Sequence, residues 1–188
     1  MNAWTSDFIF VCWVVFYIYW IISWFNTKRT IERTNGIFIR YILFFVLLIW
    51  VIDRPLSGGH ISYYFWHTNL SIGIIADVLM LVGLLFAIWA RYNIGRNWSG
   101  NITFKEDHEL ITSGPYAIVR HPIYTGILAM GLATAIYDGR AIIFALYAVL
   151  VVGLIIKYTQ EEKMMTKHFP KQYKDYKKRV KTIIPYIY

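Results

Sequence analysis

One polar stretch between two apolar segments holds the residue types that could bind a charged or polar ligand. It reads HELITSGPY from His108 and resumes as RHPIYTG from Arg120. Pro122 suits the first turn of a helix, and free N–H groups at a helix start can bind an anionic or polar group. Gly114-Pro115 marks a turn where the backbone can approach a ligand closely. The alternative is a polar helix start whose arginine reaches the lipid headgroups, and the stretch alone leaves both open.

Two adjacent carboxylates, Glu161-Glu162, follow the last long apolar segment. We expect them at the C-terminal end of a membrane helix, where negative charge opposes the helix dipole, so a cation should compensate them. Lys157 and Lys163 can do so as surface ion pairs. The ammonium group of a ligand can do so as part of a binding site, and both alternatives remain open.

The elements that must position these residues are membrane helices. Hydrophobic residues make up 57% of the chain and charged residues 16%, whereas a soluble domain carries about 25% charge. Apolar runs long enough to cross about 30 Å of hydrocarbon lie at 8–25, 37–52, 72–90 and 141–158. A shorter run at 123–137 ends in an Asp-Gly-Arg turn and forms a helical hairpin with the last run. We therefore predict an all-α integral membrane bundle of about five transmembrane helices, with 1–188 as a single domain.

The distribution of lysine and arginine predicts the orientation of the chain. These residues gather after the first, third and fifth spans, and positive residues in short loops stay in the cytoplasm. We expect the N-terminus outside and the C-terminus in the cytoplasm, with the polar loop 91–122 and the tail 159–188 both cytoplasmic. The net charge of +8 then reflects contact with membrane lipids, and no nucleic-acid partner is expected.

The cytoplasmic tail shows helical spacing of its aromatic residues. Phe169, Tyr173, Tyr176 and Val180 recur at intervals of four, three and four residues among many lysines and arginines. This spacing predicts an amphipathic helix with a narrow aromatic stripe, which we expect to lie at the headgroup surface.

Two common kinds of ligand site are not expected. Cys12 is the single cysteine and lies inside a span, so we expect no intramolecular disulfide and no cysteine metal site, and we predict no bound metal. No GxGxxG motif follows a strand. Any cofactor pocket must therefore be assembled from the loop 91–122 and the tail.

Three runs in this order resemble the isoprenylcysteine carboxyl methyltransferase family and the related phospholipid methyltransferases. They are HELITSGPYAIVRHPIYTG, the pair EE and FPKQYKDYKKRVKTIIPYI, and the resemblance spans residues 98–187. It implies a compact helical membrane enzyme that takes the methyl group of S-adenosyl-L-methionine from the cytosol. The acceptor would be lipophilic and reached from the bilayer, either an isoprenylcysteine carboxylate or another lipid-like acid, amine or thiol.

The same resemblance implies which residues contact the cofactor. Many of these contacts would come from the backbone, and Glu161 would bind the ammonium group of S-adenosylmethionine. The cofactor-binding residues implied in this way are His108, Glu109, Leu110, Ile111, Tyr116, His121, Pro122, Ile123, Tyr124 and Glu161.

One position departs from the family pattern and concerns the acceptor. Prenylcysteine enzymes of the family have an arginine four residues before the first glutamate of the pair, where this chain has Lys157. Lysine lacks the planar fork that holds a carboxylate bidentately, so the exchange weakens the expectation of a prenylcysteine carboxylate. Arg120 or Arg179 could supply the charge instead. The predicted catalytic residues are therefore Arg120, Lys157 and Arg179.

Two other functions fit part of the pattern. NADPH-dependent membrane sterol and steroid reductases have a similar C-terminal hairpin, an RHP-like re-entry and endings close to IIPYIY. Those reductases usually carry more spans, and this chain lacks an obvious extra basic pair for a 2′-phosphate. A membrane scaffold or transporter would bind neither cofactor. The leading prediction is a membrane S-adenosylmethionine-dependent methyltransferase.

Overall fold

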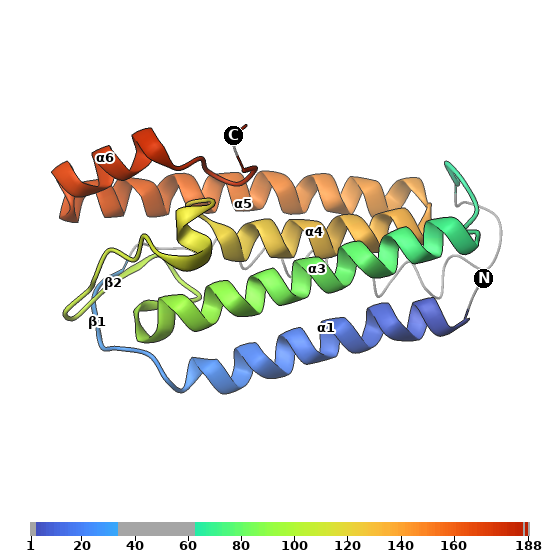
Figure 1. The fold of residues 1–188 in the computed structure, drawn as a ribbon, viewed down its shortest axis with the longest axis horizontal. Helices are drawn as coiled ribbons and strands as arrows, with labels where there is room; N and C mark the ends of the chain where they lie inside the picture. The colour runs from blue at the N-terminus through green and yellow to red at the C-terminus, as the bar shows by residue number, and fades with distance from the viewer. Residues whose placement is uncertain (1–2, 34–62, 186, 188) are drawn as a thin grey trace.

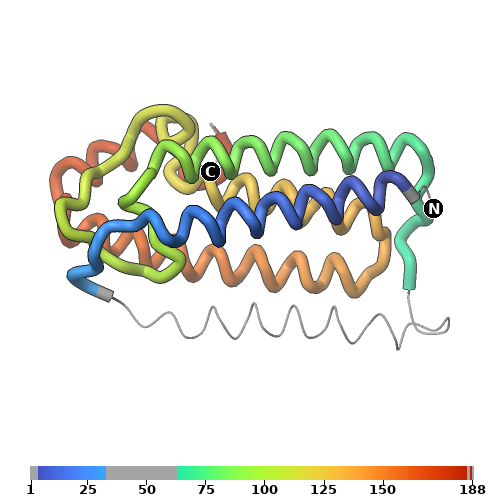
Figure 2. The backbone as a smooth tube through the Cα atoms, turned by 90° about the horizontal axis from the view of Figure 1, so that it is seen from below, coloured from blue at the N-terminus to red at the C-terminus, as the bar shows by residue number. Residues whose placement is uncertain are grey.

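The computed structural model describes residues 3–33, 63–185 and 187, which are mostly helical. Long helices run side by side along the molecule (Figure 1), and a view from below shows the same bundle (Figure 2). The helices are α1 (Ala3–Trp24), α3 (Leu70–Ile94), α4 (Pro122–Asp138), α5 (Ala141–His168) and the shorter α6 (Pro170–Arg179), with 3₁₀ turns η1 (Gly95–Asn97) and η2 (Gly114–Ala117). The predicted span 37–52 lies outside the described residues.

The surface of the bundle is apolar around its middle. Helices α1, α3 and α5 are long and apolar enough to cross a membrane. Their outward side chains include Ile22, Val82 and Val152, each more than half exposed. Helices that face water carry polar outer faces, so these faces contact lipid. The predicted all-α integral membrane bundle is therefore confirmed.

Helices α3 and α4 approach each other closely because small residues meet where the two helices touch. A Cβ atom built on Gly126 would lie 2.6 Å from the carbonyl oxygen of Gly83 and 2.7 Å from the Cβ of Ala87. Small residues allow membrane helices to pack backbone against backbone. This contact holds α4, which starts at Pro122, against the later half of α3.

A tight turn joins α4 to α5 at the end of the bundle away from α6. Gly139 ends α4 with φ of 75°, and a Cβ atom there would lie 2.3 Å from the carbonyl oxygen of Trp66. The guanidinium of Arg140 binds both carboxylate oxygens of Asp138, at 2.7 and 2.9 Å. Glycine is needed here for both its positive φ and its small size.

A two-stranded antiparallel sheet lies at the opposite end of the bundle. It pairs β1 (Thr30–Arg33) with β2 (Thr103–Lys105), and Figure 1 shows it beyond the ends of α1 and α3. The sequence analysis predicted no strand in either connection. These strands are short, and a pairing across so many residues leaves no local pattern in the sequence.

Helix α5 extends further than its apolar run predicts. The span was expected to end at Tyr158, but the helix continues without a break to His168. Hydrophobicity marks only the part of a helix inside the bilayer, whereas backbone hydrogen bonds continue through polar helix-forming residues. Glu161 and Glu162 therefore lie within the helix, and the expectation of a dipole conflict at its end is wrong.

The aromatic stripe of the tail faces the protein. Tyr173 and Tyr176 on α6 are each 3% exposed, and the Tyr176 hydroxyl donates a hydrogen bond to the carbonyl oxygen of Tyr116. Phe169 and Val180 are the residues that flank the helix. The expected amphipathic helix exists, but its apolar face packs on the bundle and is not the face that meets lipid.

The α3–α4 contact can be tested with two glycine substitutions on one helix. Gly126→Ala should lower the thermal unfolding midpoint in detergent, because overpacking costs about 1–3 kcal/mol and exceeds the gain in helix propensity of about 1 kcal/mol. Gly131→Ala is the matched control, since its Cβ would meet only side-chain atoms of Leu150 and Tyr147 at 3.2 Å. Equal midpoints for the two variants would contradict the close packing.

Candidate functional site

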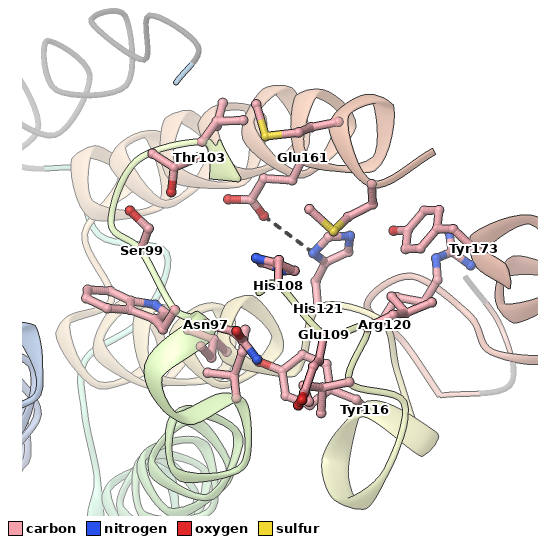
Figure 3. A pocket seen from close by; sticks show the side chains of 18 of the residues that line it. Asn97, Ser99, Thr103, His108, Glu109, Tyr116, Arg120, His121, Glu161 and Tyr173 are labelled. Carbon is pink, nitrogen blue, oxygen red and sulfur yellow. Dashed lines mark ion pairs between the residues drawn. The ribbon is translucent and has the colours of Figure 1, made fainter. Parts of the chain in front are cut away.

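A pocket opens at the end of the bundle that carries the sheet and α6. Figure 3 shows side chains converging on it from the loop after α3, the start of α4, the distal part of α5 and α6. The lining residues are Ile94, Asn97, Trp98, Ser99, Asn101, Ile102, Thr103, His108, Glu109, Leu110, Ile111, Tyr116, Arg120, His121, Ile123, Tyr124, Glu161, Met164, Met165, Tyr173 and Tyr176.

The structure brings the predicted cofactor residues together. All of them line the pocket except Pro122, which is buried in the first turn of α4 next to His121. The HELI run forms one wall and the start of α4 another, with Glu161 on α5 closing the space (Figure 3). Residues separated by about fifty positions along the chain thus share one cavity.

Glu161 presents its carboxylate to the pocket. Its Oε1 accepts a hydrogen bond of 2.6 Å from the Tyr124 hydroxyl, and its Oε2 lies 3.7 Å from Nδ1 of His121. The imidazole of His121 stacks on the ring of Tyr124, with centroids 5.6 Å apart and planes inclined by 6°. In the described part of the chain, no lysine or arginine forms an ion pair with Glu161. The carboxylate is oriented and remains available to a cationic ligand group.

Glu162, in contrast, is neutralised by the protein. Its Oε1 lies 2.7 Å from Nη2 of Arg120, and the Arg120 Nε donates to the same oxygen at 2.8 Å. Arg120 also donates to the carbonyl oxygen of Val180 and to Oγ1 of Thr182. The Arg120 side chain is 10% exposed, so the alternative of an arginine reaching the headgroups is wrong. Neither Lys157 nor Lys163 supplies the compensating charge.

The end of the tail runs beside the re-entry loop and is hydrogen-bonded to it. The N–H groups of Arg120 and His121 donate to the carbonyl oxygens of Lys181 and Thr182, at 2.8 and 3.0 Å. Thr125 adds a side-chain hydrogen bond of 2.8 Å to the carbonyl of Ile183. These two backbone N–H groups before α4, which a ligand could have used, are therefore occupied by the tail.

Three tyrosines give the pocket a neutral polar wall. Burial raises the pKa of Tyr116, and the negative charge of Glu161 raises it further. Burial likewise raises the pKa of Tyr173 and of Tyr176. All three phenols stay protonated at physiological pH, so they can donate hydrogen bonds but cannot act as bases.

The loop that carries His108 is held by aromatic stacking and an ion-pair cluster. The rings of His108 and His168 lie with centroids 4.8 and 3.6 Å from that of Phe104. Glu32 on β1 accepts hydrogen bonds of 2.8 Å from Lys167 and from His168. These contacts fasten the sheet and the loop to the end of α5.

The two remaining predicted catalytic residues lie at different distances from the pocket. Lys157 on α5 donates to the carbonyl oxygen of Gly100 at 3.1 Å, and its Nζ lies 5.3 Å from the centroid of the Tyr124 ring. Arg179 is exposed in the last turn of α6 and does not line the pocket. Lys157 is therefore next to the cavity, whereas Arg179 is outside its lining.

The wall formed by the segment after α3 was not among the predicted site residues. Asn97 is 8% exposed, and its Oδ1 is buried without a hydrogen-bond partner. Arg91 places this wall: it donates to the carbonyls of Gly95 and Ser23 at 2.7 Å and lies over the ring of Trp98 at 4.5 Å. The run NWSGN at 97–101, polar residues around a tryptophan just after a span, was the signal that could have found it.

The role of Arg120 in holding the tail can be tested by proteolysis. Arg120→Lys keeps the charge but loses the fork that contacts Glu162 and Thr182. The loss of one or two charged hydrogen bonds, each worth roughly 1.5–3 kcal/mol, should raise the fraction of molecules with a detached tail at least about tenfold. Trypsin should then release the peptide after Lys181 correspondingly faster. Arg140→Lys, at the other end of the bundle, is the control, and equal release rates would contradict the proposed tether.

The environment of His108 predicts a response to acid. Burial, together with the positive charges of Lys28, His168 and Lys105, lowers the pKa of His108 from 6.5 to about 4. The unfolded chain binds a proton in this range and the folded chain does not, so stability falls as pH falls from 6.5 toward 4. His108→Gln should lose less thermal stability across this window than the native chain. An identical acid response of the two proteins would refute the assignment.

Comparison with known proteins finds similarity to methyltransferases and to a metal-resistance protein. A family model described as phospholipid methyltransferase matches residues 72–172. Protein-S-isoprenylcysteine O-methyltransferase of Rattus norvegicus is 34% identical over 119 residues, which cover 58% of this chain and 42% of the relative. The nickel-cobalt-cadmium resistance protein NccN of Alcaligenes xylosoxydans xylosoxydans is 30% identical over 116 residues, with 59% and 52% covered. The chain thus spans about half the length of these curated relatives.

A solved structure shares the fold. The eukaryotic intramembrane Ras methyltransferase ICMT (isoprenylcysteine carboxyl methyltransferase) superposes with a TM-score of 0.55 at 20% identity, over 82% of this chain and 54% of that one. The matched family model includes most of the pocket, from the end of α3 through Glu161. The chain therefore belongs to the phospholipid methyltransferase family.

Proposed function

We propose that this chain is a membrane-embedded S-adenosylmethionine-dependent methyltransferase that acts on a lipophilic acceptor. The observation that carries the proposal is the carboxylate of Glu161. Tyr124 and His121 orient it into the pocket, and no lysine or arginine of the described residues neutralises it. A buried or half-buried carboxylate in this state favours a cationic ligand group.

The residues of the pocket fit the parts of S-adenosylmethionine. Glu161 would hold its ammonium group, and the unpartnered Oδ1 of Asn97 offers an acceptor for an N–H group. Ile102, Ile123 and Met164 supply buried apolar surface for the adenosine part. When bound, S-adenosylmethionine supplies an electrophilic methyl group on a sulfonium sulfur.

The chain contributes positioning and a preorganised polar environment. Tyr173 and Tyr176 on α6 cover one side of the pocket, and the tail segment docked by Arg120 fixes the backbone that precedes α4. Holding two reactants in line replaces a bimolecular encounter and lowers the barrier largely through entropy. Protonated phenols and a fixed carboxylate form a preorganised electrostatic environment that needs no rearrangement during the transfer.

We assign the contact with an anionic acceptor to Lys157. It lies one helical turn before Glu161 on α5, over the ring of Tyr124, which itself lines the pocket. The guanidinium of Arg120 is already bound to Glu162 and the tail, so Arg120 acts as a positioning residue. Lysine provides a point charge without a fork and accepts a wider range of acceptor groups than a bidentate arginine.

The basic residues at this end of the bundle also indicate how the chain is oriented in the membrane. The C-terminal ends of α1, α3 and α5 all lie at the end of the bundle that carries the sheet and α6 (Figure 1), and basic residues follow each of them. We infer that this end faces the cytoplasm, with the N-terminus outside and residues 1–188 forming one domain. The pocket then opens where a soluble methyl donor is present.

Binding measurements separate this proposal from the reductase alternative. Isothermal titration of the detergent-solubilised protein should show binding of S-adenosylhomocysteine and no binding of NADPH. The family assignment supports the first outcome, and none of the relatives reported above is a reductase. Binding of NADPH alone would overturn the proposal, and a scaffold would bind neither compound.

If Glu161 binds the ammonium group, removing its charge should greatly weaken the binding of S-adenosylhomocysteine. Glu161→Gln removes the charge but keeps the shape, so S-adenosylhomocysteine should bind roughly tenfold to hundredfold more weakly. Glu106→Gln is the matched control, because Glu106 is exposed and lies outside the pocket lining. Unchanged affinity of the Glu161 variant, with an unchanged unfolding midpoint, would refute its contact with the ammonium group.

A further inference from the structure

A second groove lies on the other side of the wall that follows α3. It runs between the end of α1, β1 and the segment 98–105, and it contains Trp24, Lys28 and Lys105. The segment that includes Ser99 and Thr103 lines both this groove and the methyl-donor pocket. The function proposed above does not use any of the groove's own residues.

Lys105 is a buried cation without an anionic partner. Lys105 is 4% exposed, and its Nζ donates a hydrogen bond of 3.1 Å to Oγ1 of Thr30. In the ranges that the structure describes, no carboxylate pairs with it, and burial lowers the pKa of Lys105. A buried ammonium group held only by a hydroxyl is unfavourable, and a negative ligand in the groove would offset that cost.

Thr103 provides an independent sign of a ligand on the same wall. It is 9% exposed, and its Oγ1 is buried with no hydrogen-bond partner among the residues that the structure describes. Buried hydroxyl groups in folded proteins almost always have a partner. A ligand oxygen in the groove would satisfy this hydroxyl.

Further positive charge surrounds the groove. Lys28 lines it, and its Nζ donates to the carbonyl oxygen of Asp107. Lys157 donates to the carbonyl of Gly100, which also lines the groove. No aspartate or glutamate is among the described lining residues, so the groove has a positive potential.

We propose that this groove binds a phosphate-type oxyanion, held by Lys105 and Lys28 with the Thr103 hydroxyl as a further donor. Lysine ammonium groups and hydroxyls match the several acceptor oxygens of a tetrahedral anion, which needs no planar fork. Trp24 ends the apolar helix α1 at the groove, so the site lies at the boundary of the membrane. The phosphate can belong to a lipid headgroup or be free in solution, and the site shares the wall at Thr103 with the methyl-donor pocket.

Titration of the full chain without any methyl donor tests the site. The protein is purified in dodecyl maltoside, which contains no phosphate, and titrated with inorganic phosphate and separately with dihexanoyl phosphatidic acid. Lys105→Met should weaken binding roughly tenfold or more, since it removes a charged hydrogen bond. Lys174→Met, exposed on α6, is the control and should bind as the native chain does.

The outcomes identify the source of the phosphate and can overturn the site. Binding of phosphatidic acid alone assigns the site to a headgroup, binding of inorganic phosphate alone assigns it to the free ion, and binding of both shows that either is accepted. If Lys105→Met does not fold, Thr103→Val decides, because the Thr103 hydroxyl contributes no hydrogen bond to the fold. No binding of either ligand, or unchanged affinity in the deciding variant, would overturn the proposal.

Discussion

The ion pair between Arg120 and Glu162 joins the three segments on which the pocket depends. Arg120 lies at the end of the loop before α4, Glu162 lies on the polar extension of α5, and the same guanidinium binds the tail at Val180 and Thr182. Without this contact, Glu162 would keep only the weaker contacts with His121 and Lys177, at 3.4 and 3.9 Å, and the tail would lose one of its side-chain tethers. The planar guanidinium suits this role, because its N–H groups point in several fixed directions and reach a carboxylate, a carbonyl and a hydroxyl together.

The pair also explains how two neighbouring glutamates serve different purposes. Successive residues of an α-helix point about 100° apart, so Glu162 faces Arg120 while Glu161 faces the cavity. One carboxylate is neutralised and builds the site, and the other is held only by Tyr124 and His121. The ring of His121 lies 3.7 Å from the Glu161 carboxylate and 3.4 Å from the Glu162 carboxylate. His121 therefore contacts both the glutamate that faces the pocket and the glutamate that binds Arg120.

The sequence predicted most features that depend on neighbouring residues in the chain, and few contacts between segments far apart in the chain. The membrane helices follow from apolar runs, and the wall from His108 to Tyr124 follows from one continuous motif. The pairing of β1 with β2, the inward packing of Tyr173 and Tyr176, and the role of Asn97 all depend on segments far apart in the chain. No periodicity encodes such contacts, and an amphipathic stripe does not reveal whether protein or lipid covers it. The ion-pair partner of Arg120 was missed for the same reason.

The length of α5 accounts for the position of the site relative to the membrane. Its 28 residues extend about 42 Å at 1.5 Å per residue, whereas the hydrocarbon layer is about 30 Å thick. An ionised carboxylate inside the layer would be costly, so a helix that carries one must continue beyond it. The apolar part of α5 up to Tyr158 meets lipid, and the next turn presents Glu161 to a polar pocket. One continuous helix thus places the pocket that we propose for the methyl donor next to the bilayer, the side from which the proposed lipophilic acceptor would approach.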